Sequence, residues 1–172
     1  LPVAANAATQ RDQQQYLTFM LGGEIYAMGI LSIKEIIEYG NLTTVPMMPA
    51  FIRGVINLRG SVVPVVDLAA RFGRQATAVT RRTCIVIIEI VSADEKQDVG
   101  VMVDTVNAVL EIPQAEIEPP PSFGARVRAD FIHGMGKIAG KFVIILDVNR
   151  VLSIEEMAAM GKVGAVNADA IP

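Results

Sequence analysis

The chain has 172 residues, a net charge of −3 and a pI near 5.2, and 52% of its residues are hydrophobic. The acidic balance argues against a nucleic-acid partner, because phosphate binding needs a surplus of clustered Lys and Arg. No run approaches the roughly 18 consecutive apolar residues of a membrane span, so the apolar residues must form a core and we expect no direct membrane insertion. Cys84 is the only cysteine, which excludes an internal disulfide and favours a reducing cytoplasm.

The first elements in chain order are strands. After residues 1–14, which we expect to be a disordered tail, "YLTFML" and "IYAMGI" predict a hairpin around "GGE". "SIKEIIEYG" places Ser32 three residues before Glu35, the spacing of a capping box, and predicts a short helical turn. The proline-broken "TTVPMMPAF" leads into "RGVINLRGSVVPVVDL", two apolar strands hinged at Arg59 and Gly60.

The second half repeats the first. "FIRGVINLRGSVVPVVDLAARF" (51–72) aligns without a gap on "FIHGMGKIAGKFVIILDVNRVL" (131–152). The identical pairs are Phe51/Phe131, Ile52/Ile132, Gly54/Gly134, Gly60/Gly140, Val63/Val143 and Asp67/Asp147. Further upstream, "TCIVIIEIV" matches the first strand, "SADEKQD" is a longer polar loop, and "VGVMVDTVNAVLEI" matches "YAMGILSIKEII" at an offset of 73 residues. Each half then offers about five short strands, enough for a small closed barrel, so we predict a mainly β protein of two packed barrels.

Little in the sequence suggests enzymatic chemistry. Asp67 and Asp147 invite comparison with paired catalytic carboxylates, but "VVDLA" and "ILDVN" lack the Asp-Thr/Ser-Gly loop, and an N-cap role is the ordinary explanation. His133 is the only histidine, so a metal site would rest on one imidazole, and we expect no metal and no cofactor. The repeated glycines are expected at turns or close backbone approaches.

The copies differ at one turn, where "NLRG" in the first is "KIAG" in the second. Asn57 and Arg59 are therefore polar choices that the fold did not need at Lys137 and Ala139. Function is expected where the copies differ.

"FIRGVINLRGSVVPVVDLAARFG", with "YAMGILSIKEII", "TTVPMMPAF" and "VGVMVDTVNAVL", resembles the CheW-like coupling proteins of bacterial chemotaxis, over residues 16 to 160. The resemblance implies two intertwined SH3-like five-stranded barrels around a shared core. It also implies a cytoplasmic, non-enzymatic adaptor at membrane receptor arrays, monomeric when isolated, that joins chemoreceptor cytoplasmic tips to the regulatory domain of the histidine kinase CheA. The expected divisions are a CheW-like domain at 15–160, with subdomain one about 15–80 and possible strand exchange, subdomain two about 81–152, a terminal helix at 153–160 from "SIEEMAAM", and a flexible tail at 161–172.

The resemblance also implies two binding surfaces. The receptor-facing groove between the barrels would involve Ile33, Glu35, Ile36, Gly54, Arg59, Cys84, Ile85, Gly100 and Val106. The kinase would meet the "LTTVPMMP" loop through Val45, Met47 and Met48. An apolar groove of this kind suits the apolar face of a helical hairpin, with Arg59 and Glu35 fixing register at its rim.

Two alternatives stay open. The same domain occurs as the regulatory module of CheA and at the front of CheV-type adaptors, so the chain could be a fragment of either. A two-fold aspartate hydrolase is the distant alternative, since a fold alone does not exclude it.

Overall fold

The computed structural model describes residues 13–92, 95–120 and 131–151. The expected terminal helix (153–160), the tail beyond it and residues 1–12 lie outside this part. The described strands are β1 (Gln13–Leu21), β2 (Glu24–Gly29), β3 (Ile33–Glu38), β4 (Ile52–Leu58), β5 (Ser61–Asp67), β6 (Cys84–Ser92), β7 (Glu95–Val103), β8 (Thr105–Pro113), β9 (Ile132–Ile138) and β10 (Lys141–Leu146). The short helices are η1 (Ile30–Ser32), α2 (Leu68–Arg71), η2 (Gln114–Glu116) and α3 (Val148–Val151).

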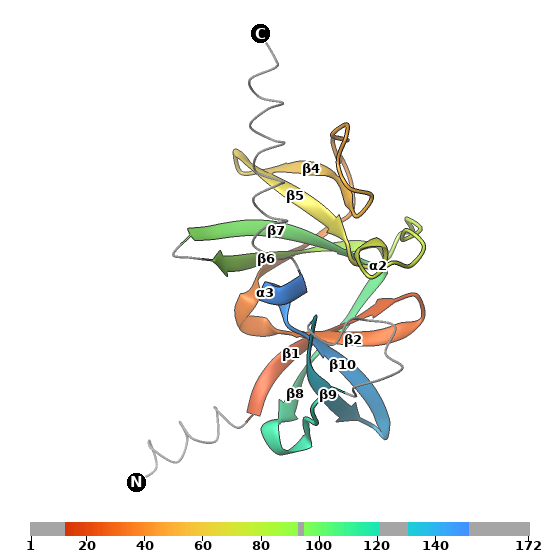
Figure 1. The fold of residues 1–172 in the computed structure, drawn as a ribbon, viewed down its shortest axis with the longest axis vertical. Coiled ribbons are helices and arrows are strands. Elements are labelled where there is room, and N and C mark those ends of the chain that lie inside the picture. Colours follow the sequence, from red (N-terminus) through yellow and green to blue (C-terminus); the bar gives the residue numbers. More distant parts are fainter. Residues whose placement is uncertain (1–12, 93–94, 121–130, 152–172) are drawn as a thin grey trace.

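The strands form two five-stranded sheets stacked on each other (Figure 1). One sheet, the β1 barrel, has the order β8-β1-β2-β10-β9, and the other, the β6 barrel, has the order β3-β6-β7-β5-β4. In each, a bridge brings the chain after one edge strand onto the opposite edge: Thr43 pairs with Val55 and Glu118 pairs with Met135. The expected mainly β fold of two SH3-like five-stranded barrels is confirmed.

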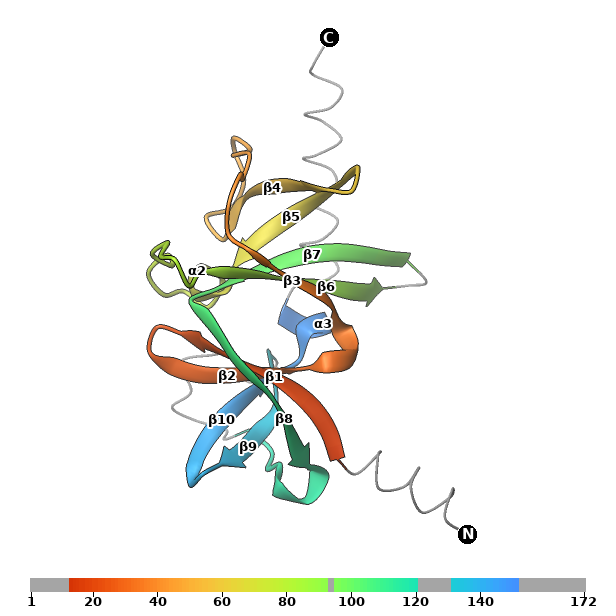
Figure 2. The same cartoon turned by 180° about the vertical axis from the view of Figure 1, so that it is seen from behind.

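The barrels exchange strands. Strands β1 and β2 belong to the β1 barrel, but the chain then crosses at η1 and gives β3, β4 and β5 to the β6 barrel. The second half does the reverse, giving β6 and β7 to the β6 barrel and β8, β9 and β10 to the β1 barrel (Figure 2). Each sheet therefore contains strands from both halves of the sequence, and neither half can complete a sheet alone.

The strand register agrees with the repeat. In the parallel pairings, Ala27 on β2 faces Ile145, and its equivalent Gly100 on β7 faces Val65. The equivalent edge strands β3 and β8 share a bulge as well. On β3 the register against β6 shifts between Ile33 and Glu35. On β8 the register against β1 shifts between the equivalent residues, Val106 and Ala108. A bulge that occurs at the same place in both copies belongs to the fold itself.

One apolar cluster joins the barrels. It contains fully buried side chains from both, including Phe19 and Tyr26 of the β1 barrel and Val86 and Val101 of the β6 barrel. Each barrel also has a smaller interior cluster of its own, around Ile85 in one and Ile145 in the other. The largest buried side chains are thus placed where the barrels meet, so their association removes much of the apolar surface from water.

Three sequence-based predictions were wrong. Ser32 and Glu35 do not form a capping box: the helical turn is η1, which ends at Ser32, and Glu35 lies in β3. The β-branched residues of "IKEIIE" pair with β6, and this pairing outweighs the local helix signal. Residues 95–98 of the expected polar loop extend β7, and β1 begins at Gln13, inside the expected tail.

The repeated turns are as predicted. Arg59 and Gly60 both have positive φ (52° and 87°), as do Ala139 and Gly140 (51° and 80°), which is the backbone of a tight two-residue hairpin. A Cβ on Gly54 would overlap the Thr43 carbonyl oxygen, so this glycine permits the bridge next to it.

Candidate functional site

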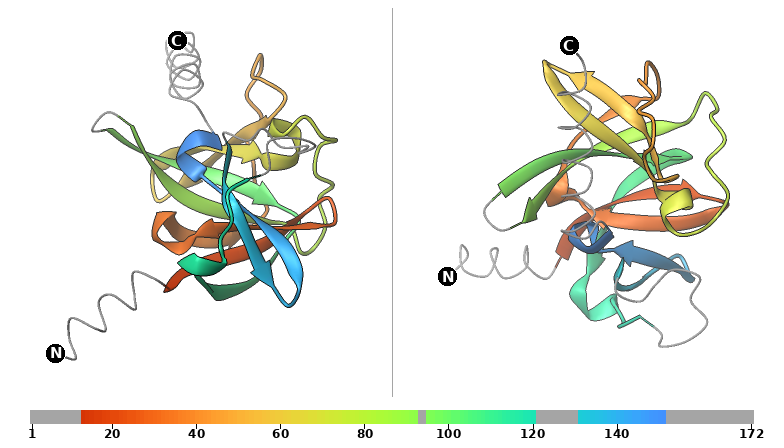
Figure 3. Two further views of the ribbon diagram at one scale, coloured as in Figure 1. Left: turned by 60° about the horizontal axis from the view of Figure 1, so that its bottom comes forward. Right: turned by 45° about the horizontal axis from the view of Figure 1, so that its top comes forward.

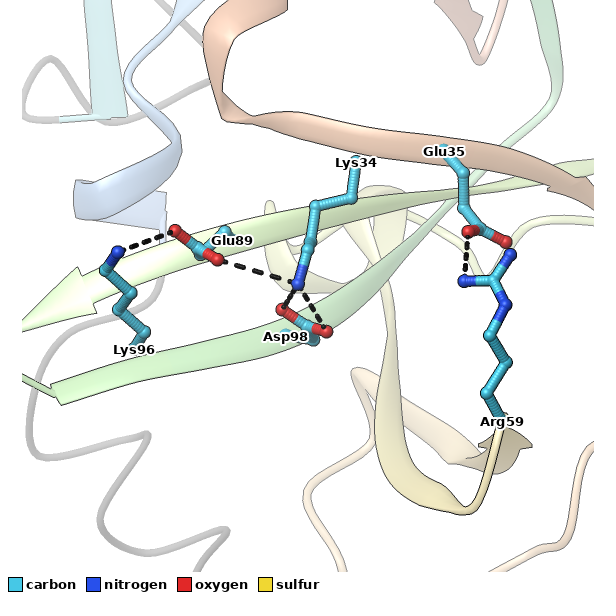
Figure 4. A network of polar contacts seen from close by, with 6 residues as sticks. All are labelled: Lys34, Glu35, Arg59, Glu89, Lys96 and Asp98. Carbon is cyan, nitrogen blue, oxygen red and sulfur yellow. Dashed lines mark hydrogen bonds and ion pairs between the residues drawn. The ribbon is translucent and has the colours of Figure 1, made fainter.

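Strand β3 carries the most prominent of the predicted site residues. It is an edge strand, paired only with β6 in its sheet, and its side chains alternate between half-buried and exposed. Because of the bulge, Lys34 and Glu35 both point towards β6, β7 and the β4–β5 hairpin (Figure 4). The predicted receptor-facing residues fall into three groups around this strand.

The first group is an ion pair. Arg59 Nη1 lies 2.8 Å from Glu35 Oε2, and it joins the tip of the β4–β5 hairpin to edge strand β3 (Figure 4). The Arg59 side chain is 76% exposed and that of Glu35 only 26%. Asn57 shapes the same turn, since its Oδ1 accepts a hydrogen bond from the Gly60 N–H at 2.9 Å. The pair therefore presents a guanidinium to solvent from a fixed turn.

The second barrel lacks this pair. Glu35 faces Ile87 directly after the β3 bulge, and the residue at the corresponding place on β8 is Ala108, opposite Thr18. Ala139 holds the turn position of Arg59 with nearly the same φ. Both partners are thus alanine in one copy and charged in the other, so the charges are not needed for the barrel fold.

The second group lies where the barrels meet. Ile33, Cys84 and Val106 are half-buried and pack on the shared core, and Ile36, 43% exposed, faces Val86 of that core across the strands. Val106 comes from β8 of the β1 barrel, whereas the other three belong to the β6 barrel. The group is an apolar surface that straddles the two barrels.

The thiol of Cys84 is held in its neutral form. Burial raises its pKa, the negative charge of Glu38 raises it further, and a hydrogen bond with the Val106 backbone acts in the opposite direction. The thiol also donates to the Arg82 carbonyl at 3.3 Å. Cys84 therefore contributes a small apolar side chain to this surface.

The third group is buried. Ile85 is fully buried in the interior of the β6 barrel, and Gly54 and Gly100 are buried as well. A Cβ on Gly100 would lie 2.7 Å from Ile85 Cγ2, so this glycine leaves room for the Ile85 side chain of the neighbouring antiparallel strand β6. These three residues can shape the surface, but they offer no side chain to a partner.

A neighbouring cluster of charges was not predicted from the sequence. Glu89 and Asp98 face each other directly across β6 and β7, and like charges at such a pair destabilise a sheet. Lys34 Nζ bridges them, 3.0 Å from Asp98 Oδ1 and 3.5 Å from Glu89 Oε2 (Figure 4). The hydrogen bond from Lys34 to Asp98 raises the pKa of the lysine, so the bridging charge is retained. The signal available in the sequence was the pair of acidic residues, Glu89 and Asp98, on neighbouring strands that place them opposite each other.

The predicted kinase-facing loop is only partly exposed. Met47 is 97% exposed and has a positive φ of 62°, whereas Met48 packs on the shared core and Val45 is half-buried. Within this loop Met47 thus offers the freest apolar side chain.

Among the described residues, no group of three or more His, Cys, Asp or Glu side chains is arranged to hold a metal ion. No helix in the described part is long and apolar enough to cross a membrane.

The sequence and the fold are both similar to those of known proteins. The model of the CheW-like domain matches residues 15–156. The chain is 32% identical over 163 residues to the chemotaxis protein CheW of Klebsiella aerogenes, covering 95% of this chain and 96% of that protein. It is 35% identical over 143 residues to CheW of Bacillus subtilis, covering 83% and 88% respectively. The crystal structure of the scaffolding protein TtCheW from Thermoanaerobacter tengcongensis superposes with a TM-score of 0.75 at 32% identity, over 84% of this chain and 90% of that one.

The chain belongs to the CheW-like family. Its function is accordingly that of a chemotaxis adaptor, a scaffold in signal transduction.

Proposed function

We propose that this adaptor couples the cytoplasmic tips of chemoreceptors to the regulatory domain of a CheA histidine kinase at receptor arrays. The observation that carries the proposal is an apolar surface across the barrels, which shares edge strand β3 with an ion pair that one copy of the repeat has and the other lacks. Because the other barrel has alanine at both positions, the pair is not required for the barrel fold, and its exposed guanidinium is available to a partner.

The receptor tip is proposed to bind at Ile33, Ile36, Cys84 and Val106. These side chains are apolar and incompletely buried, so the apolar face of a helical hairpin would remove their remaining surface from water. The Arg59 guanidinium, held by Glu35, would meet polar groups at the rim and set the register of the helices.

The kinase regulatory domain is proposed to bind at the loop before β4, with Met47 as the central contact. A nearly fully exposed methionine is a flexible apolar side chain suited to a partner surface. The two surfaces share no residue, so both partners can be held by one chain, and the adaptor itself is proposed to be a monomer.

The test uses charge placed at equivalent positions. Ile36→Glu introduces a carboxylate on β3, and Val109→Glu introduces the same change at the equivalent residue of β8, which is 47% exposed against 43% for Ile36. Each folded variant is titrated against an isolated receptor tip and an isolated kinase regulatory domain. Ile36→Glu is expected to weaken receptor binding by about 2 kcal/mol or more, because an unpaired carboxylate is desolvated in the complex. Val109→Glu is the control and should change it little.

Met47→Glu completes the design. It should weaken kinase binding and leave receptor binding intact, since independent surfaces give independent energies. If Ile36→Glu and Met47→Glu each weakened both partners equally, the two-surface proposal would be wrong. If Ile36→Glu and Val109→Glu gave the same loss, the receptor surface would not be confined to the proposed side chains.

A further inference from the structure

The α2 segment, residues 68–74, consists of α2 and the three residues that follow it, and it crosses from one barrel to the other. It follows β5 of the β6 barrel, yet its aromatic and basic side chains contact the β1 barrel. Phe72 stacks on Tyr26 with ring centroids 6.1 Å apart, and Arg74 Nη2 lies 3.0 Å from Glu24 Oε2. Figure 3 shows α2 beside the β1–β2 hairpin. This segment therefore links the two barrels by specific side-chain contacts.

Arg71 occupies the centre of the link. Its Cζ lies 4.7 Å from the ring centroid of Phe131 and 5.3 Å from that of Phe51. These two phenylalanines are the equivalent residues of the repeat, and their carbonyls accept hydrogen bonds from the equivalent N–H groups of Asp147 and Asp67. One guanidinium thus contacts both copies of the same position, one in each barrel.

The other copy has no such guanidinium. Val151, at the end of α3, stands where Arg71 stands at the end of α2. Among the described residues, α3 contacts the β6 barrel through a 3.4 Å hydrogen bond from the Val91 N–H to Asn149 Oδ1 and through Val148, which packs in the shared core. The guanidinium between the rings is therefore a specific feature of the α2 side.

We propose that Arg71 is a positioning residue that holds the two barrels at one relative angle. A cation over an aromatic ring is directional, and a planar guanidinium between two rings restrains both. The proposed receptor surface has Val106 in one barrel and Ile36 and Cys84 in the other, so its shape depends on that angle. This second part rests on the proposed function. Arg71 acts there without touching the receptor.

The first experiment measures the distance between a label on each barrel, which changes with the relative angle of the barrels, and it needs no partner. Spin labels are attached through Val62→Cys and Phe142→Cys, equivalent exposed residues on the two outer hairpins, in a Cys84→Ala background. Arg71→Met should broaden the distribution of distances between the labels. Arg150→Met is the matched control, since Arg150 lies in α3, with a side chain 69% exposed, and it should leave the distribution unchanged. An unchanged distribution in Arg71→Met overturns the proposal. Arg71→Lys, which keeps the charge but not the planar group, should broaden it less, and it serves as the test if Arg71→Met does not fold.

The second experiment measures binding with Cys84 in place. Arg71→Met should weaken binding of an isolated receptor tip on the order of threefold to tenfold, since two cation–aromatic contacts are lost. Binding of the kinase regulatory domain, proposed at Met47, should change less than twofold. A broadened distribution with unchanged receptor affinity overturns the positioning role. If the unaltered protein binds no receptor tip, the proposed function fails, and the label distances alone decide whether Arg71 holds the barrels.

Discussion

The two barrels have the same strand order, the same bulge and the same turn in the β4–β5 and β9–β10 hairpins, but they differ in charged side chains. The β6 barrel has the Glu35–Arg59 pair, and the β1 barrel has alanine at both positions. The fold requires the repeated glycines, the alternation of side chains along each strand and the strand register. It does not require these charged side chains. The repeat also gives each experiment on one barrel an internal control in the other.

The repeated aspartates show a second difference. Asp67 is fully buried, caps α2 by accepting from the Ala69 N–H at 3.1 Å, and accepts from the Thr77 N–H and Oγ1–H at 2.8 and 2.7 Å. Asp147 is 31% exposed and accepts from the Asn149 N–H at 3.1 Å. The predicted cap role is confirmed for Asp67, which in addition fastens the loop after α2 to its barrel.

The largest effect is expected from separating the two copies. A chain that ends at Arg74 keeps the hairpins β1–β2 and β4–β5, but β3 loses its only strand partner, β6. Such small pieces rarely hold a core together without disulfides or metal. We expect no cooperative unfolding transition by calorimetry, whereas the whole chain should show one. A sharp transition in the fragment would mean that the first copy folds by itself.

The aspartates should differ in their contribution to stability. Asp67→Ala removes four hydrogen-bond acceptances and leaves buried donors unsatisfied, so the free energy of unfolding should fall by about 3 kcal/mol. Asp147→Ala removes a half-exposed cap and should cost about 1 kcal/mol. Urea unfolding of both variants measures the difference. Equal losses would show that the buried contacts to Thr77 add nothing to the cap.

The ion pair should matter little for stability. Arg59→Ala is expected to lower the free energy of unfolding by less than about 0.5 kcal/mol, because exposed ion pairs contribute little and Ala139 holds the same turn. The pair can also be placed in the other barrel by Ala108→Glu with Ala139→Arg. A double-mutant cycle there should give a coupling of about 0.2–1 kcal/mol. A loss of several kcal/mol in Arg59→Ala would make Arg59 structural.

The smallest effect concerns the reactivity of Cys84. Because its pKa is raised, less thiolate is present at pH 8 than for a free thiol, and alkylation by iodoacetamide should be slower by a few-fold. Glu38→Gln removes the charge that adds to the effect of burial on the pKa, so it should increase the rate. The rate as a function of pH gives the pKa of each form. A Glu38→Gln rate identical to that of the unaltered protein would show that burial alone keeps the thiol protonated.

Much of the fold follows from local patterns. The hairpin at Arg59 and Gly60, the cap at Asp67 and the two-fold repeat all depend on residues close together in the chain or on a repeated pattern. The residues of the candidate site were predicted through the family resemblance. The structure then separated the predicted residues into exposed and buried, because exposure depends on packing: Ile36 and Ile85 are similar residues with opposite burial.

By itself, the sequence determined the places of the tight turns and the equivalence of the two halves, because alternation and turn chemistry act over a few residues. Only the tertiary structure decided which strands the halves exchange, that Glu35 meets Arg59 and that Arg71 lies between Phe51 and Phe131. These contacts join segments distant in sequence. They form because the apolar faces of both sheets must be buried together, and no local pattern specifies which side chains that burial brings into contact.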